Sequence, residues 1–147
     1  MKIMFDMDGT IADFYGVEGW LEYLEAYLTT PYEIAKPLLH FATLARMLNR
    51  LQNDGYEIGI ISWCSRSGTP EYNARVALAK RKWLAKHLPS VRFDEIHIVP
   101  YGTPKNLFNT GDDSDPHIVP AAHAVASDHT FTKGIIAHHA AGIIRAI

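Results

Sequence analysis

Short apolar runs and longer amphipathic stretches alternate along the first hundred residues. Three of the short runs, bounded by charged or loop-forming residues, are typical of buried strands and cover residues 2–5, 56–61 and 96–99. Apolar positions at helical spacing predict helices over residues 17–28, 39–53 and 70–88, with a further helix start at Thr30. Strands that alternate with helices of this length predict an α/β fold with a parallel sheet.

The pattern weakens in the last third of the chain, from residue 106 to residue 147. There we expect short strands over residues 123–127 and 134–137, and a terminal helix or strand over residues 140–147. A chain of 147 residues is long enough for one complete core and too short for two ordinary ones. The prediction is therefore a single domain over residues 1–147.

Composition and charge narrow the classes of partner. With 48% apolar and 20% charged residues the chain is expected to be globular, and no apolar run approaches the roughly 20 residues that span a bilayer. A formal net charge of -2 offers no basic field, so long nucleic acids are not expected as partners, although a mononucleotide needs only a local phosphate site. Cys64 is the single cysteine and Asp6 interrupts the apolar N-terminus, so we expect neither an internal disulfide nor a signal peptide. These features predict a cytoplasmic protein; they do not predict its oligomeric state.

Reactive side chains follow the predicted strands. Asp6 and Asp8 come after the first strand, Ser62 after the second and Lys105 shortly after the third. The carboxyl ends of parallel strands meet at one edge of the sheet, where ligands bind in this fold class. A carboxylate such as Asp6 can attack phosphorus, and a second one, Asp8, can exchange a proton with the leaving group and with water. A hydroxyl and an ammonium can stabilise phosphoryl oxygens, and Mg²⁺ would relieve the repulsion between the two carboxylates.

Three segments resemble motifs of the haloacid dehalogenase-like superfamily. Phe5-Asp6-Met7-Asp8-Gly9-Thr10 resembles the first motif, and Ile58-Gly59-Ile60-Ile61-Ser62 is similar to the second. Lys105, in Gly102-Thr103-Pro104-Lys105, lies where the lysine of the third motif belongs. The resemblance covers roughly residues 1–105 and extends to small 5'-nucleotidase-type members.

The resemblance implies a three-layer Rossmann-like parallel sheet with a small helical cap, and a cap or flap insertion around residues 14–40. It implies that Asp6 is the nucleophile and a metal ligand, and that Asp8 is the general acid and base and a ligand through its backbone carbonyl. The phosphate-binding residues would be Ser62, Lys105, Gly9 and Thr10. The implied activity is Mg²⁺-dependent hydrolysis of phosphomonoesters through an aspartyl-phosphate intermediate, on nucleoside 5'-monophosphates or deoxynucleotides.

The fourth motif of the superfamily, an acidic metal-binding pair, has two candidates. Asp112 and Asp113 provide two adjacent acids but follow Lys105 closely, with no convincing strand before them. Asp128 follows a better strand at a better distance but has no acidic neighbour. We expect Asp112 and Asp113 to bind the metal, with Asp128 as the rival.

Other interpretations of the same residues remain open. The chain could keep the fold as a catalytically weak or inactive protein that binds nucleotides or phosphate, or it could act on a sugar phosphate or a polynucleotide end. Four aromatic residues near the predicted cleft could stack on a nucleobase, although core packing is the better explanation: Phe14, Tyr15, Trp20 and Trp63.

Overall fold

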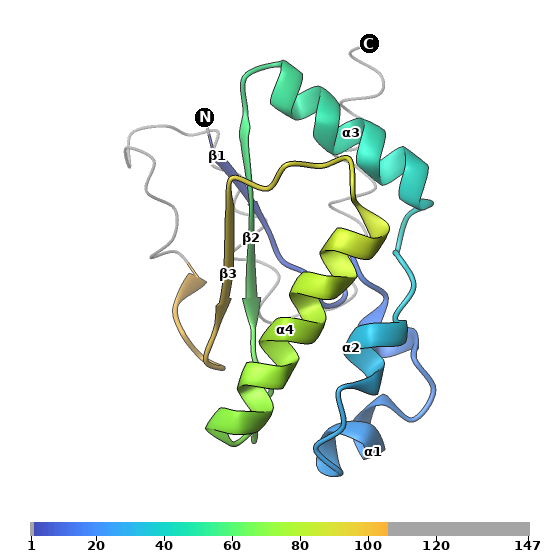
Figure 1. The fold of residues 1–147 in the computed structure, drawn as a ribbon, viewed down its shortest axis with the longest axis vertical. Coiled ribbons are helices and arrows are strands. Elements are labelled where there is room, and N and C mark those ends of the chain that lie inside the picture. Colours follow the sequence, from blue (N-terminus) through green and yellow to red (C-terminus); the bar gives the residue numbers. More distant parts are fainter. Residues whose placement is uncertain (1, 106–147) are drawn as a thin grey trace.

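The computed structural model describes residues 2–105, which form a parallel three-stranded sheet flanked by helices (Figure 1). The strands are β1 (Lys2–Phe5), β2 (Glu57–Trp63) and β3 (Glu95–Val99), and they pair in the order β1-β2-β3. The three predicted strands and their parallel arrangement are confirmed, and the fold class is α/β.

Five helical segments connect the strands. They are η1 (Phe14–Gly16), α1 (Trp20–Glu25), α2 (Thr30–Ile34), α3 (Phe41–Asn53) and α4 (Pro70–His87). The helices predicted over 39–53 and 70–88 are confirmed within two residues. The helix predicted over 17–28 is shorter, because Gly19 adopts a left-handed conformation (φ 71°) and α1 begins only after it.

The main core joins β2 to α3 and α4. Ile58 and Ile60, two residues apart on one face of β2, belong to the same buried cluster as Leu48 of α3 and Trp83 of α4. Both long helices therefore pack against the same face of the sheet, and α4 runs alongside the strands in Figure 1. Within residues 2–105 this gives a sheet with one helical layer, and the three-layer arrangement remains a prediction.

A second buried cluster attaches the segment after β1 to α4. Phe14 of η1 and Tyr32 of α2 pack with Tyr72 and Val76 of α4. The Tyr72 hydroxyl also donates a hydrogen bond to the carbonyl oxygen of Leu28, at 2.9 Å. The segment expected to form a cap or flap is thus held against α4 on the same side of the molecule as the predicted site.

The register of the sheet brings the motif residues to one edge. Phe5 lies opposite Ile60, so Asp6 follows β1 at the level where β2 approaches Ser62. β2 continues to Trp63, which pairs with Val99, so Ser62 lies inside the strand and not after it as predicted. Its position is nevertheless at the carboxyl end of the sheet, next to the ends of β1 and β3.

Several predicted elements and ligands lie outside the described residues. These are the strands and terminal element predicted beyond residue 106, and the acids Asp112, Asp113 and Asp128. Within residues 2–105, no helix combines the length and apolar character required to cross a membrane.

Candidate functional site

A tight turn presents Asp6 and Asp8 at the end of β1. The N–H groups of Ile11 and Ala12 both donate to the carbonyl oxygen of Met7, at 3.0 and 2.9 Å. Gly9 has a φ of 73°, a conformation that favours glycine, and the Met7 side chain is buried in the core. The buried Met7 anchors the turn, and the two carboxylates on either side of it are held in fixed positions.

Asp6 is paired with Lys105, as expected if both belong to one site. Its Oδ1 accepts a hydrogen bond from the backbone N–H of Met7 at 2.8 Å, and its Oδ2 lies 2.6 Å from the Lys105 ammonium. The side chains of Asp6 and Lys105 are 11% and 7% exposed, so this ion pair is largely shielded from water. The prediction that topology would bring Lys105 to Asp6 is confirmed as a matter of geometry.

Trp63 holds Lys105 in place. The Lys105 ammonium lies 4.5 Å from the centre of the Trp63 ring, a cation–π distance. The indole N–H of Trp63 donates to the carbonyl oxygen of Thr103, at 2.8 Å, in the loop that leads from β3 to Lys105. One side chain at the end of β2 thus contacts both the lysine and its loop.

Asp8 is paired with a lysine that the sequence analysis did not identify. Lys80, on α4, is fully buried, and its ammonium lies 2.5 Å from Asp8 Oδ2. The same ammonium donates to Ser62 Oγ at 2.8 Å and to the carbonyl oxygen of Trp63 at 2.7 Å. An ammonium has three donors, and here all three have acceptors. Lys80 therefore joins α4, the end of β2 and the turn that carries Asp8.

The helical pattern contains a signal that could have found Lys80. It lies four residues after Val76 and four before Leu84, both buried, and so occupies the middle of the apolar stripe of α4. A lysine in such a stripe must find an acceptor or an anion inside the protein, because burying its charge alone is costly. The sequence does not say which carboxylate provides it.

The environment of Asp8 makes its carboxylate easier to protonate than that of an ordinary aspartate. Burial raises the pKa of the Asp8 carboxyl above its usual value, and the negative charge of Asp6 adds to this, whereas Lys80 opposes it. A carboxyl group whose pKa is raised can donate a proton nearer to neutral pH, which is what a general acid requires.

The other predicted phosphate ligands are placed differently from Lys105. Ser62 is fully buried, accepts its hydrogen bond from Lys80 and is not among the described residues that line the pocket over Asp6. Thr10 is 5% exposed, and its Oγ1 is a buried atom without a hydrogen-bond partner in the described part of the chain. Neither Gly9 nor Thr10 is among the described residues of that pocket wall. Ser62, Gly9 and Thr10 thus lie near the two carboxylates in the fold, but none of the three is among the described residues that line the pocket.

A pocket of about 300 Å³ contains Asp6, Asp8 and Lys105. Six of its thirteen described lining residues are aromatic: Phe14, Tyr15, Trp20, Tyr32, Trp63 and Tyr101. Burial, together with the charges of Asp8 and Asp6, raises the pKa of Tyr15 to about 12, so this phenol stays neutral near pH 7. The pocket thus combines uncharged aromatic side chains with the charged groups of Asp6, Asp8, Lys105 and Arg66. The volume is at the lower end of the range for small-molecule sites.

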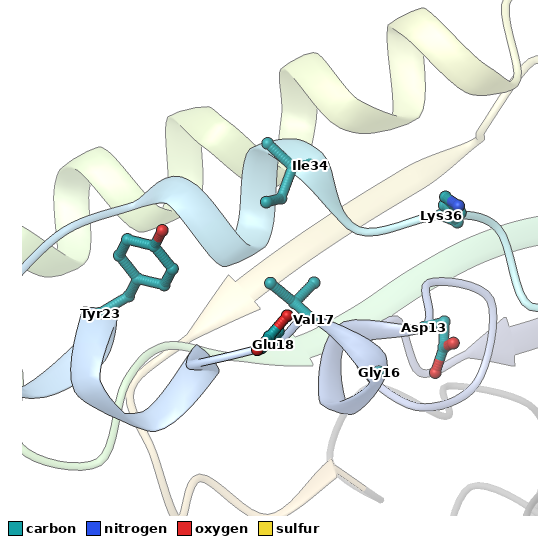
Figure 2. Close-up of a pocket in the computed structure, with 7 residues that line it drawn as sticks. All are labelled: Asp13, Gly16, Val17, Glu18, Tyr23, Ile34 and Lys36. Carbon is teal, nitrogen blue, oxygen red and sulfur yellow. The ribbon is translucent and has the colours of Figure 1, made fainter.

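A larger pocket, of about 570 Å³, lies on the segment after the turn (Figure 2). It is lined by side chains such as Tyr23 of α1, Ile34 of α2 and Lys36 (Figure 2). Asp6, Asp8 and their lysine partners are not among the described residues that line it. The chemistry at the sheet edge therefore belongs to the smaller pocket.

The donors at the sheet edge fit a hard cation such as Mg²⁺. Mg²⁺ in proteins is usually held by one or two carboxylates together with waters and substrate phosphate. Asp6 offers a carboxylate and Asp8 a backbone carbonyl oxygen, and both residues line the same pocket, whereas a group of three or more His, Cys, Asp or Glu side chains is not found within residues 2–105. Within residues 2–105 the protein therefore offers part of the usual Mg²⁺ ligand set, and water or substrate oxygens would complete it.

We compared the chain with protein-family models, with curated proteins and with solved structures, and no match was found in any of the three comparisons. Its function is therefore inferred from its own residues and their geometry.

Proposed function

We propose that this protein is a Mg²⁺-dependent phosphomonoester hydrolase of the haloacid dehalogenase-like type, with Asp6 as the nucleophile. The observation that carries the proposal is the arrangement of Asp6, Asp8 and Lys105. The two carboxylates of an Asp-x-Asp-Gly-Thr turn lie at the carboxyl end of a parallel sheet, and the lysine expected from the third motif contacts the first of them.

In the first step, a carboxylate oxygen of Asp6 attacks phosphorus and the bond from phosphorus to the ester oxygen breaks. The leaving oxygen takes a proton from Asp8, the proposed general acid, whose pKa is raised above the usual aspartate value. The Met7 N–H and Lys105 orient the Asp6 carboxylate, and Lys105 also places a positive charge where the phosphoryl oxygens gain negative charge.

In the second step, water attacks the phosphorus of the aspartyl phosphate. Asp8, now a carboxylate, accepts a proton from that water, and the bond from phosphorus to the Asp6 oxygen breaks to release inorganic phosphate. Lys80 fixes the position of Asp8 for both transfers through the contact at 2.5 Å.

Mg²⁺, held by the Asp6 side chain and the Asp8 backbone carbonyl, would supply positive charge opposite the phosphoryl oxygens. We assign the remaining protein ligands to Asp112 and Asp113, with Asp128 as the rival, all three outside the described residues.

The pocket supports a small substrate, and we propose a nucleoside 5'-monophosphate or deoxynucleotide. Its aromatic walls suit a planar base, and its volume of about 300 Å³ suits a single nucleotide better than a polymer. The proposal includes the full three-layer Rossmann-like fold with the segment around residues 14–40 as a cap, of which residues 2–105 provide the sheet and one helical layer.

One observation favours a second candidate, a nucleotide-binding protein without turnover. Each carboxylate has its own ammonium partner, Lys105 for Asp6 and Lys80 for Asp8, so the four charges balance without a cation. A site that needs no metal to neutralise its carboxylates can bind ligands without performing the reaction.

Hydrolysis of p-nitrophenyl phosphate with Mg²⁺, with a chelator, and by the Asp6→Asn variant distinguishes the two candidates. A hydrolase should cleave p-nitrophenyl phosphate only with Mg²⁺. In Asp6→Asn the rate of hydrolysis should fall by about a thousandfold or more, because an amide is a poor nucleophile. Activity of Asp6→Asn within tenfold of the parent would rule out the covalent mechanism. Binding of nucleotide without turnover by the folded parent would favour the second candidate.

A further inference from the structure

Arg66 is a cation in the pocket wall that the proposed reaction does not use. It lies three residues beyond the end of β2, is exposed, and lines the same pocket as Asp6. Its guanidinium lies 5.7 Å from the centre of the Tyr101 ring, and no carboxylate within residues 2–105 pairs with it. Its hydrogen-bond donors are therefore available to a ligand.

Arg66 is connected to the proposed nucleophile through a series of intermediate side chains. A series of contacts leads from Asp6 to Lys105, from Lys105 to the Trp63 ring, and from there to the Tyr101 ring, whose centre is 5.0 Å from that of Trp63. Arg66 follows Tyr101 as the last member of this series. A phosphate bound at Asp6 would therefore leave Arg66 to contact the group that departs from it.

The surroundings of Arg66 suit a planar ring better than a second anion. Tyr101 is 49% exposed and lies between Arg66 and Trp63, so ring surface is available beside the guanidinium. Aromatic ring faces bind nucleobases by stacking, whereas a ring face has no hydrogen-bond donor for a second phosphate or a carboxylate. An arginine beside such a ring presents a flat fork of N–H donors to the edge of a base.

We propose that Arg66 and Tyr101 form a base-binding subsite that selects 6-oxopurine nucleotides, those of guanine and hypoxanthine. Guanine offers two adjacent acceptors, O6 and N7, to which an arginine binds through two parallel hydrogen bonds. Adenine presents an amino group in place of O6, so its N–H donors would face the donors of Arg66. The inference rests on the proposed function only in taking a nucleotide as the ligand.

The test measures binding as well as turnover. Quenching of tryptophan fluorescence on titration with GMP, IMP, AMP and CMP reports affinity, since Trp20 and Trp63 line the pocket. The titrations are made with Mg²⁺ and with a chelator. Turnover of the same nucleotides, and of p-nitrophenyl phosphate, is measured in parallel with Mg²⁺.

The parent should bind GMP and IMP more tightly than AMP and CMP, by a factor on the order of 10 to 100. Arg66→Gln should bring the ratio of GMP to AMP affinity close to one. Arg46→Gln, at an exposed arginine of α3 away from the pocket, is the matched control and should keep the parental ratio. Tyr101→Leu should weaken all four nucleotides, and Tyr101→Phe, which keeps the ring, should weaken them less.

Equal affinity of the parent for GMP and AMP, an unchanged ratio in Arg66→Gln, or no nucleotide binding in either buffer would each overturn the inference. Tighter binding of a ribose or nucleoside bisphosphate than of GMP, lost in Arg66→Gln, would replace it with a second anion site. Failure of p-nitrophenyl phosphate hydrolysis together with selective GMP binding would reject the proposed hydrolase and retain the base-binding subsite.

Discussion

Replacing Lys80 by methionine removes the buried charge that connects α4 to the Asp-x-Asp turn. Methionine has a similar length and is apolar, so it fills the space without a large cavity. The variant loses the three hydrogen bonds to Asp8 Oδ2, Ser62 Oγ and the Trp63 carbonyl. It also leaves Asp8, whose side chain is 19% exposed, without its ammonium partner.

Breaking a buried ion pair by removing one partner costs about 3–5 kcal/mol. The total stability of a domain is only about 5–15 kcal/mol, so Lys80→Met should lower the free energy of unfolding by a large fraction of the whole. Urea unfolding followed by circular dichroism measures this loss. Exposed Lys82→Met, on the same helix, is the matched control and should change the free energy of unfolding by less than about 0.5 kcal/mol.

The loss should depend on pH in a direction set by Asp8. Burial raises the pKa of folded Asp8 above its usual 3.8, and removing Lys80 removes the charge that opposes this shift. A carboxyl group whose pKa is raised in the folded state lowers the free energy of unfolding as pH increases through that pKa. Below the pKa of the unfolded state it does not change the free energy of unfolding. The difference between parent and Lys80→Met should therefore be smallest below about pH 4 and increase toward neutral pH.

The double variant Lys80→Met/Asp8→Asn separates the charge from the packing. With both charges removed, no unpaired charge remains, and the double variant should be more stable at pH 7 than Lys80→Met alone. A loss below about 1 kcal/mol in Lys80→Met, or strictly additive effects in the double variant, would refute the idea that Lys80 and Asp8 compensate each other inside the protein.

Three further predictions concern other parts of the chain. Trp63→Phe loses the hydrogen bond to Thr103 but keeps a ring beside Lys105, so its kcat/KM should fall less than that of Trp63→Leu; equal losses would mean that the ring does not hold the lysine. Hydrogen bonds from Lys2 and then His97 hold the pKa of Glu95 below its usual 4.5. Glu95→Gln should therefore lower the free energy of unfolding, by less than about 1 kcal/mol because the group is partly exposed. Urea unfolding between pH 3 and 7 should show this difference above pH 4.5 and its loss as pH falls through the folded pKa. The Mg²⁺ concentration for half-maximal activity should rise in Asp112→Ala and in Asp113→Ala, which remove the proposed metal ligands. A rise in Asp128→Ala alone would reverse the assignment.

Much of the fold of residues 2–105 follows from local signals. The apolar run of β1 ends at a charge, and Thr69 and Pro70 mark the start of α4, where Thr69 accepts a hydrogen bond from the Tyr72 N–H at 3.2 Å. The helix predicted over 17–28 is shorter than expected, because its apolar spacing continues past Gly19, whose left-handed backbone conformation the spacing does not indicate.

The sequence predicted that Asp6 and Lys105 would meet at one edge of the sheet, because strand topology indicates it; their ion pair was not predicted. Both residues follow parallel strands, and such strands end at the same edge whatever the details of packing. Ser62 shows where topology is not enough. Its strand position was nearly right, yet its hydroxyl is bound to Lys80 and buried, and only the helix that covers β2 decides this.

Lys80 marks the limit of sequence reasoning for this site and also explains how the site is held. It is separated from Asp8 by 72 positions, so no local pattern relates the two residues. Each would be costly to bury alone, since an unpaired charge inside a protein loses its hydration without compensation. The position of each residue therefore depends on the other. α4 must pack on β2 so that the Lys80 ammonium reaches the turn after β1, and that turn must hold the Asp8 carboxylate within contact of the ammonium. The contact that relieves the buried charge of a helix thus also fixes the orientation of the proposed general acid.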